Sequence, residues 1–191
     1  MGSALALSMS VLTRDDKIEA CHLSYCEATN PAEGRATLVE DAIGLGYSHM
    51  LWIDSDMDFK PADVAKLVTF AHGRPGGELI VGANYVKRNP PHISTATDLK
   101  GEPLEFGDGG TEEVGSIGMG LCVTSIDVFA KIDRPWFVNA WISGSEYMGE
   151  DVWLCLQARK RGIKNLCDKD IDIGHVGKEN FRWRSPRTLS S

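Results

Sequence analysis

Short apolar runs alternate with segments of helical character through the first half of the chain. The runs HMLWI at residues 49–53 and ELIVGA at residues 78–83 are almost wholly apolar, which is typical of buried strands in a parallel sheet. Two segments next to these runs carry helix-start signals. The pair Asn30-Pro31 puts an N-cap residue before a proline, and Pro61 opens a second helical segment.

The same alternation continues after a stretch rich in glycine, proline and polar residues at positions 85–120. The pattern predicts a strand at residues 121–125 and an amphipathic helix at residues 149–161. We therefore predict an α/β fold with a mostly parallel central sheet flanked by helices. This single domain is expected to cover residues 1–177, followed by a basic and aromatic tail at residues 178–191.

The first dozen residues fit two different elements. Leu5, Leu7, Met9 and Val11 alternate with small residues, as in a strand, whereas Leu5, Met9 and Leu12 also lie on one face of a helix. Periodicity alone does not decide between these two interpretations. Both stay open at the level of the sequence.

Length and composition indicate an ordinary globular protein. The chain has 191 residues, of which 42% are hydrophobic and 25% are charged. No apolar run approaches the roughly 18 residues that a membrane span requires. The apolar stretch at residues 4–12 is short and has no basic segment before it, so we expect neither a signal peptide nor a membrane span.

Charge and cysteine usage exclude further classes of protein. The 20 Lys and Arg residues face 27 Asp and Glu residues, giving a net charge of −7, so we expect no extended nucleic-acid surface. The five cysteines are odd in number and scattered, which does not resemble a disulfide framework. We therefore expect a reducing compartment, the cytoplasm. The cysteines are Cys21, Cys26, Cys122, Cys155 and Cys167.

An acidic cluster directly follows the apolar run at residues 49–53. Asp54 and Asp56 are two positions apart, so in an extended segment both point to the same side and can bind one Mg²⁺ or Mn²⁺ ion. A calcium-binding EF-hand loop is excluded, because Phe59 and Ala65 occupy its required Gly and Glu positions. A phosphatase of the haloacid dehalogenase type also uses Asp-x-Asp after a strand, although Met57 departs from its pattern.

Three more titratable residues are candidates for chemistry. Glu150 and Asp151 open the predicted helix at residues 149–161, where carboxylates also favour the helix dipole. Asp151 would lie at the mouth of the sheet, as a general base requires. His175 lies between glycines just past a predicted strand, where structural and metal-ligand interpretations are about equally favoured.

The order of these segments resembles a known family. Arg35 in an early helix is followed by HMLWIDSDMDF, SIGMGLCVTSIDVF, GEDVWLCLQARKRGI and IGHVG. This ordered set resembles glycosyltransferases of the GT-A fold, close to family 2 and to small phage- or virus-encoded members, over roughly residues 30 to 177. The resemblance implies a single GT-A (Rossmann-like) domain and a hexosyltransferase-type enzyme. It also implies a donor that is a nucleotide-diphosphate sugar, and a host cytoplasm if the chain is viral.

The resemblance also implies roles for individual residues. In that family the Asp-x-Asp (DXD) carboxylates hold Mn²⁺ or Mg²⁺ on the diphosphate of the donor, which implies Asp54 and Asp56 as metal ligands, with Ser55 beside the donor. A late histidine can be a further metal ligand, which implies His175. The acidic pair at the helix start carries the catalytic base of inverting members, which implies Asp151. A retaining outcome stays open.

Two basic residues are implied to bind the donor. Arg35 is expected to approach the nucleotide or its diphosphate, and Lys178 belongs to a tail that resembles a mobile flap. The resemblance also implies an acceptor that is a carbohydrate or another compound with a hydroxyl group. The Gly/Pro-rich stretch at residues 85–120 or a partner chain, such as a second copy in a homodimer, would recognise this acceptor.

Other interpretations stay open beside the leading one. A phosphatase or nucleotidyltransferase could use the same Asp54 and Asp56 metal site. A non-catalytic nucleotide-sugar-binding module is the third hypothesis, because the family's first nucleotide-binding strand is missing if the first dozen residues form a helix. Trp136 and Trp141 could stack on a sugar, although aromatic residues in loops more often serve packing. Tyr85, Lys87 and Arg88 form either a phosphate-binding group or a solvated face.

Overall fold

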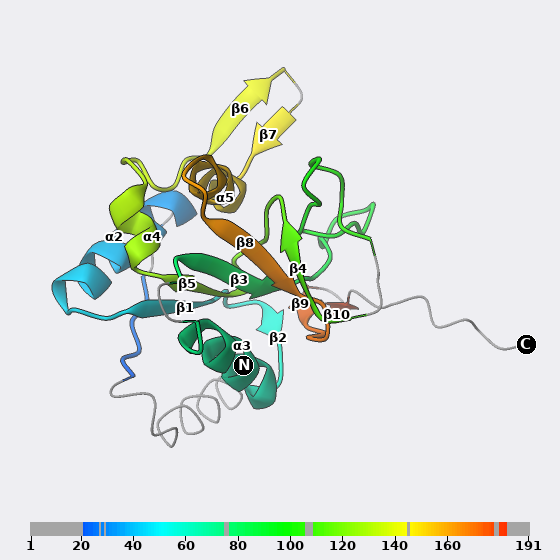
Figure 1. Cartoon of the computed structure of the whole chain (residues 1–191). Coiled ribbons are helices and arrows are strands. Elements are labelled where there is room, and N and C mark those ends of the chain that lie inside the picture. Colours follow the sequence, from blue (N-terminus) through cyan, green and yellow to red (C-terminus); the bar gives the residue numbers. More distant parts are fainter. Residues whose placement is uncertain are drawn as a thin grey trace, which may run out of the picture.

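The computed structural model describes residues 21–26, 28, 30–74, 77–105, 109–144, 146–177 and 180–182. Their centre is a five-stranded sheet (Figure 1) with the strand order β1-β5-β3-β8-β4. In that order the strands are β1 (His49–Ile53), β5 (Leu121–Ser125), β3 (Leu79–Ala83), β8 (Lys164–Asp168) and β4 (Thr111–Val114). Lys178 and the first dozen residues, with their two interpretations, lie outside the described residues.

The expectation of a mostly parallel sheet is wrong, whereas the α/β class is confirmed. The pairs β1–β5, β3–β5 and β4–β8 are antiparallel, and β3–β8 is the parallel pair of this sheet. The physical reason is that β5 lies between β1 and β3 and runs opposite to both. Val123 of β5 faces Leu51 on one side and Val81 on the other.

Helices cover both faces of this sheet, as predicted. Helix α3 (Pro61–His72) packs against β3 and β5 on one face, and its buried residues share a core with Leu79 and Val81. Helices α2 (Pro31–Gly44), α4 (Asp127–Lys131) and α5 (Glu150–Lys160) contribute to a second core that contains Ile80. All three residues at 79, 80 and 81 are buried, and they join the two cores in turn because successive side chains of a strand point to opposite faces. No helix in the described ranges is long and apolar enough to cross a bilayer.

Local signals in the sequence explain where the helices begin. The side chain of Asn30 accepts a hydrogen bond of 3.1 Å from the backbone N–H of Ala32, so the predicted N-cap of α2 is confirmed. At the start of α3 the carboxylate of Asp63 accepts from the backbone N–H of Lys60 at 2.8 Å. Because these contacts satisfy donors that a helix leaves free, each helix begins at its proline.

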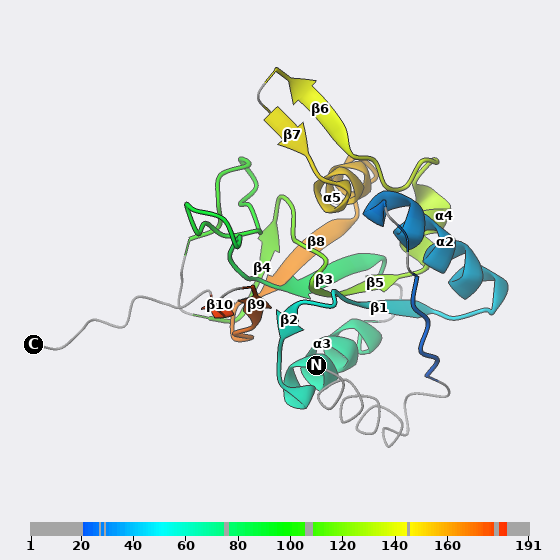
Figure 2. The ribbon, with the colours of Figure 1, turned by 180° about the vertical axis from the view of Figure 1, so that it is seen from behind.

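Two smaller sheets flank the central one. The first joins β2 (Met57–Asp58), β9 (Gly174–Val176) and β10 (Asn180–Arg182), with β9 in the middle. The second is a hairpin of β6 (Ala140–Ser143) and β7 (Glu146–Met148), which projects from the molecule above α5 (Figures 1 and 2). The first small sheet places His175 of β9 opposite Met57, beside the acidic turn that follows β1.

Candidate functional site

The acidic residues lie in a tight turn at the end of β1. The backbone N–H of Asp54 donates to the carbonyl of Gly120 at 3.0 Å, which continues the pairing of β1 with β5 by one residue. The backbone N–H of Met57 then donates to the carbonyl of Asp54 at 3.3 Å and closes the turn. Ser55 lies exposed in this turn, between the two carboxylates of Asp54 and Asp56.

Arg35 connects this turn to the start of α5. Its Nη2 atom is 2.9 Å from Oδ1 of Asp54, and its Nε atom is 3.2 Å from Oε1 of Glu150. Its guanidinium also lies 5.6 Å from the ring centroid of Trp52, a distance typical of a cation–π contact. Only 12% of the Arg35 side chain is exposed, so this single cation links α2, β1 and α5 in a largely desolvated place.

Burial disfavours the charged form of Asp54. Burial raises the pKa of Asp54 above its ordinary value, and the charges of Asp56 and Glu150 raise it further. The Arg35 guanidinium lowers this pKa, but the net shift is upward. Arg35 therefore compensates only part of the cost of ionising Asp54, and a further cation would find a favourable place beside this carboxylate.

Asp56 faces the imidazole of His175. Nε2 of His175 is 3.3 Å from Oδ2 of Asp56, while Nδ1 is 3.0 Å from the carbonyl oxygen of Val86. Because a carbonyl only accepts, Nδ1 carries a proton, and in the neutral ring Nε2 then presents a lone pair to the carboxylate. Two acceptors at this distance need a positive group between or beside them, so the pair fits either a proton or a metal ion.

Backbone pairing fixes this contact between Asp56 and His175. The backbone N–H of Val176 donates to the carbonyl of Asp56 at 2.7 Å, and β9 pairs with β2. The ring of Tyr85 meets the imidazole edge to face, with the centroids 5.2 Å apart. The position of the imidazole is thus set by a strand pair on one side and an aromatic ring on the other.

Asp54, Asp56 and His175 are neighbours but do not form a ready metal centre. No group of three metal-ligating side chains with suitable spacing is found among the described residues. Asp54 is turned to Arg35, and Asp56 also pairs with Nη1 of Arg88 at 3.1 Å. The donor set, two carboxylates and one imidazole with its second nitrogen fixed, still fits Mn²⁺ or Mg²⁺ in chemical type.

Asp151 lies in the first turn of α5, next to Glu150. Its Oδ1 atom accepts from the backbone N–H of Val152 at 2.7 Å, so it also satisfies the helix start as the dipole argument expects. Burial raises its pKa, the neighbouring charge of Glu150 raises it further, and the hydrogen bond and Arg35 lower it. The net upward shift brings this carboxylate closer to the working range of a general base.

Reasoning from the sequence missed two contacts that shape the site and left the role of a third residue undecided. Neither the link from Glu150 to Arg35 nor the buried Tyr85, whose hydroxyl accepts from the backbone N–H of Gly120 at 3.1 Å, was expected. A side chain on Gly118 or Gly120 would collide with the Tyr85 ring, so these glycines make room for it. Of the basic group after β3, Arg88 contacts the site through Asp56.

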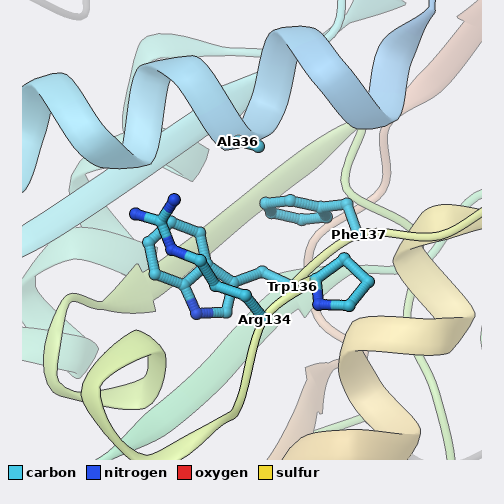
Figure 3. Close-up of a pocket in the computed structure, with 5 residues that line it drawn as sticks. Ala36, Arg134, Trp136 and Phe137 are labelled. Atoms are coloured by element: carbon cyan, nitrogen blue, oxygen red, sulfur yellow. The ribbon is translucent and has the colours of Figure 1, made fainter.

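The two candidate aromatic residues for sugar stacking have different environments. Trp136 is buried, and its Nε1–H donates to the carbonyls of Phe129 and Ile132 at 3.1 Å, so it serves packing. It also lines a pocket with Arg134 and three neighbours (Figure 3), and of these five residues Trp136 alone was a candidate from the sequence. Trp141 lies on the projecting hairpin and is 70% exposed.

Comparison with known proteins relates this chain to a solved structure. No protein-family model matches the chain, and no curated protein sequence matches it. The fold is similar to that of A197 from STIV, with a TM-score of 0.59 and 18% sequence identity. The match covers 90% of this chain and 79% of A197. At this identity the likeness concerns the α/β fold.

Proposed function

We propose that the protein is a metal-dependent glycosyltransferase that moves a sugar from a nucleotide-diphosphate sugar to an acceptor hydroxyl. One observation supports this most strongly. Residues from separate parts of the chain meet at the end of β1, where Arg35 contacts Asp54 and Asp56 contacts His175. The resemblance implies that these residues bind the donor and its metal ion. Glu150, adjacent to the proposed base Asp151, joins them through Arg35.

The acidic turn and the imidazole are the proposed metal ligands. Asp54, Asp56 and His175 would hold Mn²⁺ or Mg²⁺, which as a Lewis acid stabilises the charge that develops on a leaving diphosphate. The raised pKa of Asp54 and the acceptor pair of Asp56 and His175 both favour a cation here. Arg35 and Arg88, which pair with these carboxylates, are suited to bind phosphate oxygens through their forked guanidinium groups.

Asp151 is the proposed general base. Glycosyl transfer has a transition state resembling an oxocarbenium ion, and an acceptor hydroxyl attacks more readily when a carboxylate takes its proton. The upward shift of the Asp151 pKa makes this carboxylate a stronger base than an ordinary surface aspartate. Attack on the sugar face opposite the leaving diphosphate then inverts the anomeric centre.

Ligand-dependent thermal stability tests the donor site. We expect the melting temperature of the wild type to rise with one sugar nucleotide of a common panel, and only when Mn²⁺ is present, because a ligand of the folded state stabilises it by mass action. Asp54→Asn and Asp56→Asn should each lose this rise. Asp41→Asn, on the exposed part of α2, is the matched control and should keep it.

Several results of that screen would contradict the proposal. Equal Mn²⁺-dependent responses in the wild type, Asp54→Asn and Asp56→Asn would remove both carboxylates as metal ligands. Hydrolysis of a phosphomonoester without any response to sugar nucleotides would favour the phosphatase. Binding of a donor without any turnover, unchanged in Asp151→Asn, would favour a non-catalytic binding module.

A further inference from the structure

The hairpin of β6 and β7 carries an exposed aromatic pair close to the site. Trp141 and Tyr147 lie opposite each other in the strand register, and their ring centroids are 5.2 Å apart at an interplanar angle of 64°. Trp141 is 70% exposed and Tyr147 is 54% exposed. Figures 1 and 2 show that this hairpin stands away from the central sheet.

The rest of the described structure leaves three large side chains of the hairpin, Trp141, Ile142 and Tyr147, more than half exposed. Trp141 and Ile142 are adjacent in β6, at the point where its pairing with β7 shifts register, and both are more than half exposed. A hairpin of two strands is marginally stable in water by itself, and contiguous exposed apolar patches commonly mark binding sites. These residues are therefore available to a ligand rather than to the protein core.

The root of the hairpin is fixed to the helix starts that carry the site. Oδ1 of Asn139 accepts from the backbone N–H of Glu150 at 3.1 Å, at the start of α5. Its Nδ2 atom donates to Oδ1 of Asn30, the N-cap of α2, at 3.4 Å. Tyr147 precedes Asp151 by four residues, so their Cα atoms are at most about 14 Å apart.

We propose that Trp141 and Tyr147 form an acceptor subsite that binds a neutral carbohydrate, an inference that rests on the proposed glycosyl transfer. A sugar ring has a flat face of C–H groups and a polar rim. Trp and Tyr offer the matching combination of an apolar ring surface and one polar group each. The exposed carboxylate of Glu146, next to Tyr147, adds an acceptor for sugar hydroxyl groups.

The size of the patch favours a small ligand over a protein partner. From their exposed fractions, Trp141, Ile142 and Tyr147 offer roughly 350 Å² of surface, whereas a stable protein interface buries about 800 Å² on each partner. The patch is thus less than half of what a stable dimer needs. One or two sugar rings are a better match in size.

The charge of the hairpin favours a neutral ligand. Glu146 is the sole charged residue between positions 139 and 149 of the sequence, and the whole chain has a net charge of −7. Anionic membranes and nucleic acids are bound through clusters of Lys and Arg, which this segment does not contain. A neutral carbohydrate meets no repulsion from this surface.

Binding to an array of neutral oligosaccharides, without any donor, tests the subsite. We expect the wild type to bind at least one glycan, and Trp141→Ala and Tyr147→Ala each to weaken that binding by about tenfold or more, as expected for aromatic anchors. Tyr25→Ala is the matched control, because Tyr25 is an aromatic residue that is 81% exposed on the segment before α2. It should bind as the wild type does.

Several outcomes would overturn the subsite. The first is that the wild type binds no neutral glycan. The second is that all variants that circular dichroism shows to be folded bind equally well. The third is that Trp141 is needed for dimer formation or vesicle association instead of glycan binding. The proposed glycosyl transfer can be contradicted independently of the subsite. Trp141-dependent glycan binding without any sugar-nucleotide response would contradict transfer alone, whereas a sugar-nucleotide response without such glycan binding would contradict the subsite alone.

Discussion

At the scale of single residues, the site holds carboxylates whose burial disfavours their charged form. Arg35 is the cation shared by Asp54 and Glu150, and the pKa of Asp54 is nevertheless raised. Asp151, one residue beyond Glu150, has a raised pKa for a similar reason, since burial penalises its charged form. The folded protein thus maintains two carboxylates that ionise less readily than they would in water.

The burial of Asp151 predicts how this residue affects stability as a function of pH. Because its pKa is higher in the folded than in the unfolded state, the contribution of Asp151 to stability is most favourable below the ordinary carboxyl pKa of about 3.9. It decreases as the pH rises from there through the raised pKa. We expect Asp151→Asn to melt at a higher temperature than the wild type at pH 7, with the difference vanishing below about pH 4.

Thermal unfolding followed by circular dichroism from pH 3.5 to 7.5 measures this difference. Asp127→Asn is the control, because Asp127 also lies in the first turn of a helix, α4, and is outside the site. A wild type that melts above Asp151→Asn at pH 7 would contradict the proposed environment of this carboxylate.

At the scale of elements, the pairing of β1 with β5 gives the acidic turn its position. Trp52 of β1 donates from Nε1 to Oγ1 of Thr124 on β5 at 2.9 Å, and both side chains are buried. The same indole lies beneath Arg35. This hydrogen bond therefore connects the strand pair to the cation that the acidic residues share.

We expect removal of the acceptor of this hydrogen bond to cause a measurable loss of stability. Thr124→Val keeps the shape of the side chain but leaves the buried indole N–H without its partner, which should cost about 1–3 kcal/mol in the free energy of unfolding. Thr124→Ser retains the hydroxyl and should cost less. Urea unfolding measures both, and an equal or smaller loss in Thr124→Val than in Thr124→Ser would contradict this role.

The sequence predicted the elements better than their arrangement. The apolar run at residues 49–53 and the helix starts at Pro31 and Pro61 are confirmed as β1, α2 and α3, because burial and capping are local properties. The parallel sheet was wrong because Val81 and Val123 lie in equally apolar runs, which contain no information about strand direction or neighbour. Strand order depends on packing across the whole chain.

At the scale of the whole molecule, the site is a product of tertiary contacts. The resemblance drew attention to Arg35, Asp54 and His175, and the structure brings all three to the end of β1. The bond from Arg35 to Glu150 could not be predicted, because it depends on how α2 packs beside α5. Lys178 lies outside the described residues, so its expected role stays a prediction.

Release of nucleoside diphosphate from a panel of sugar nucleotides in the presence of Mn²⁺ tests the central claim most directly. The account predicts release from at least one donor by the wild type, a rate lower by about 10²–10⁴ in Asp151→Asn, and none in Asp54→Asn. Asp41→Asn should match the wild type. Equal release by the wild type and Asp151→Asn, or no release from any donor, would contradict it.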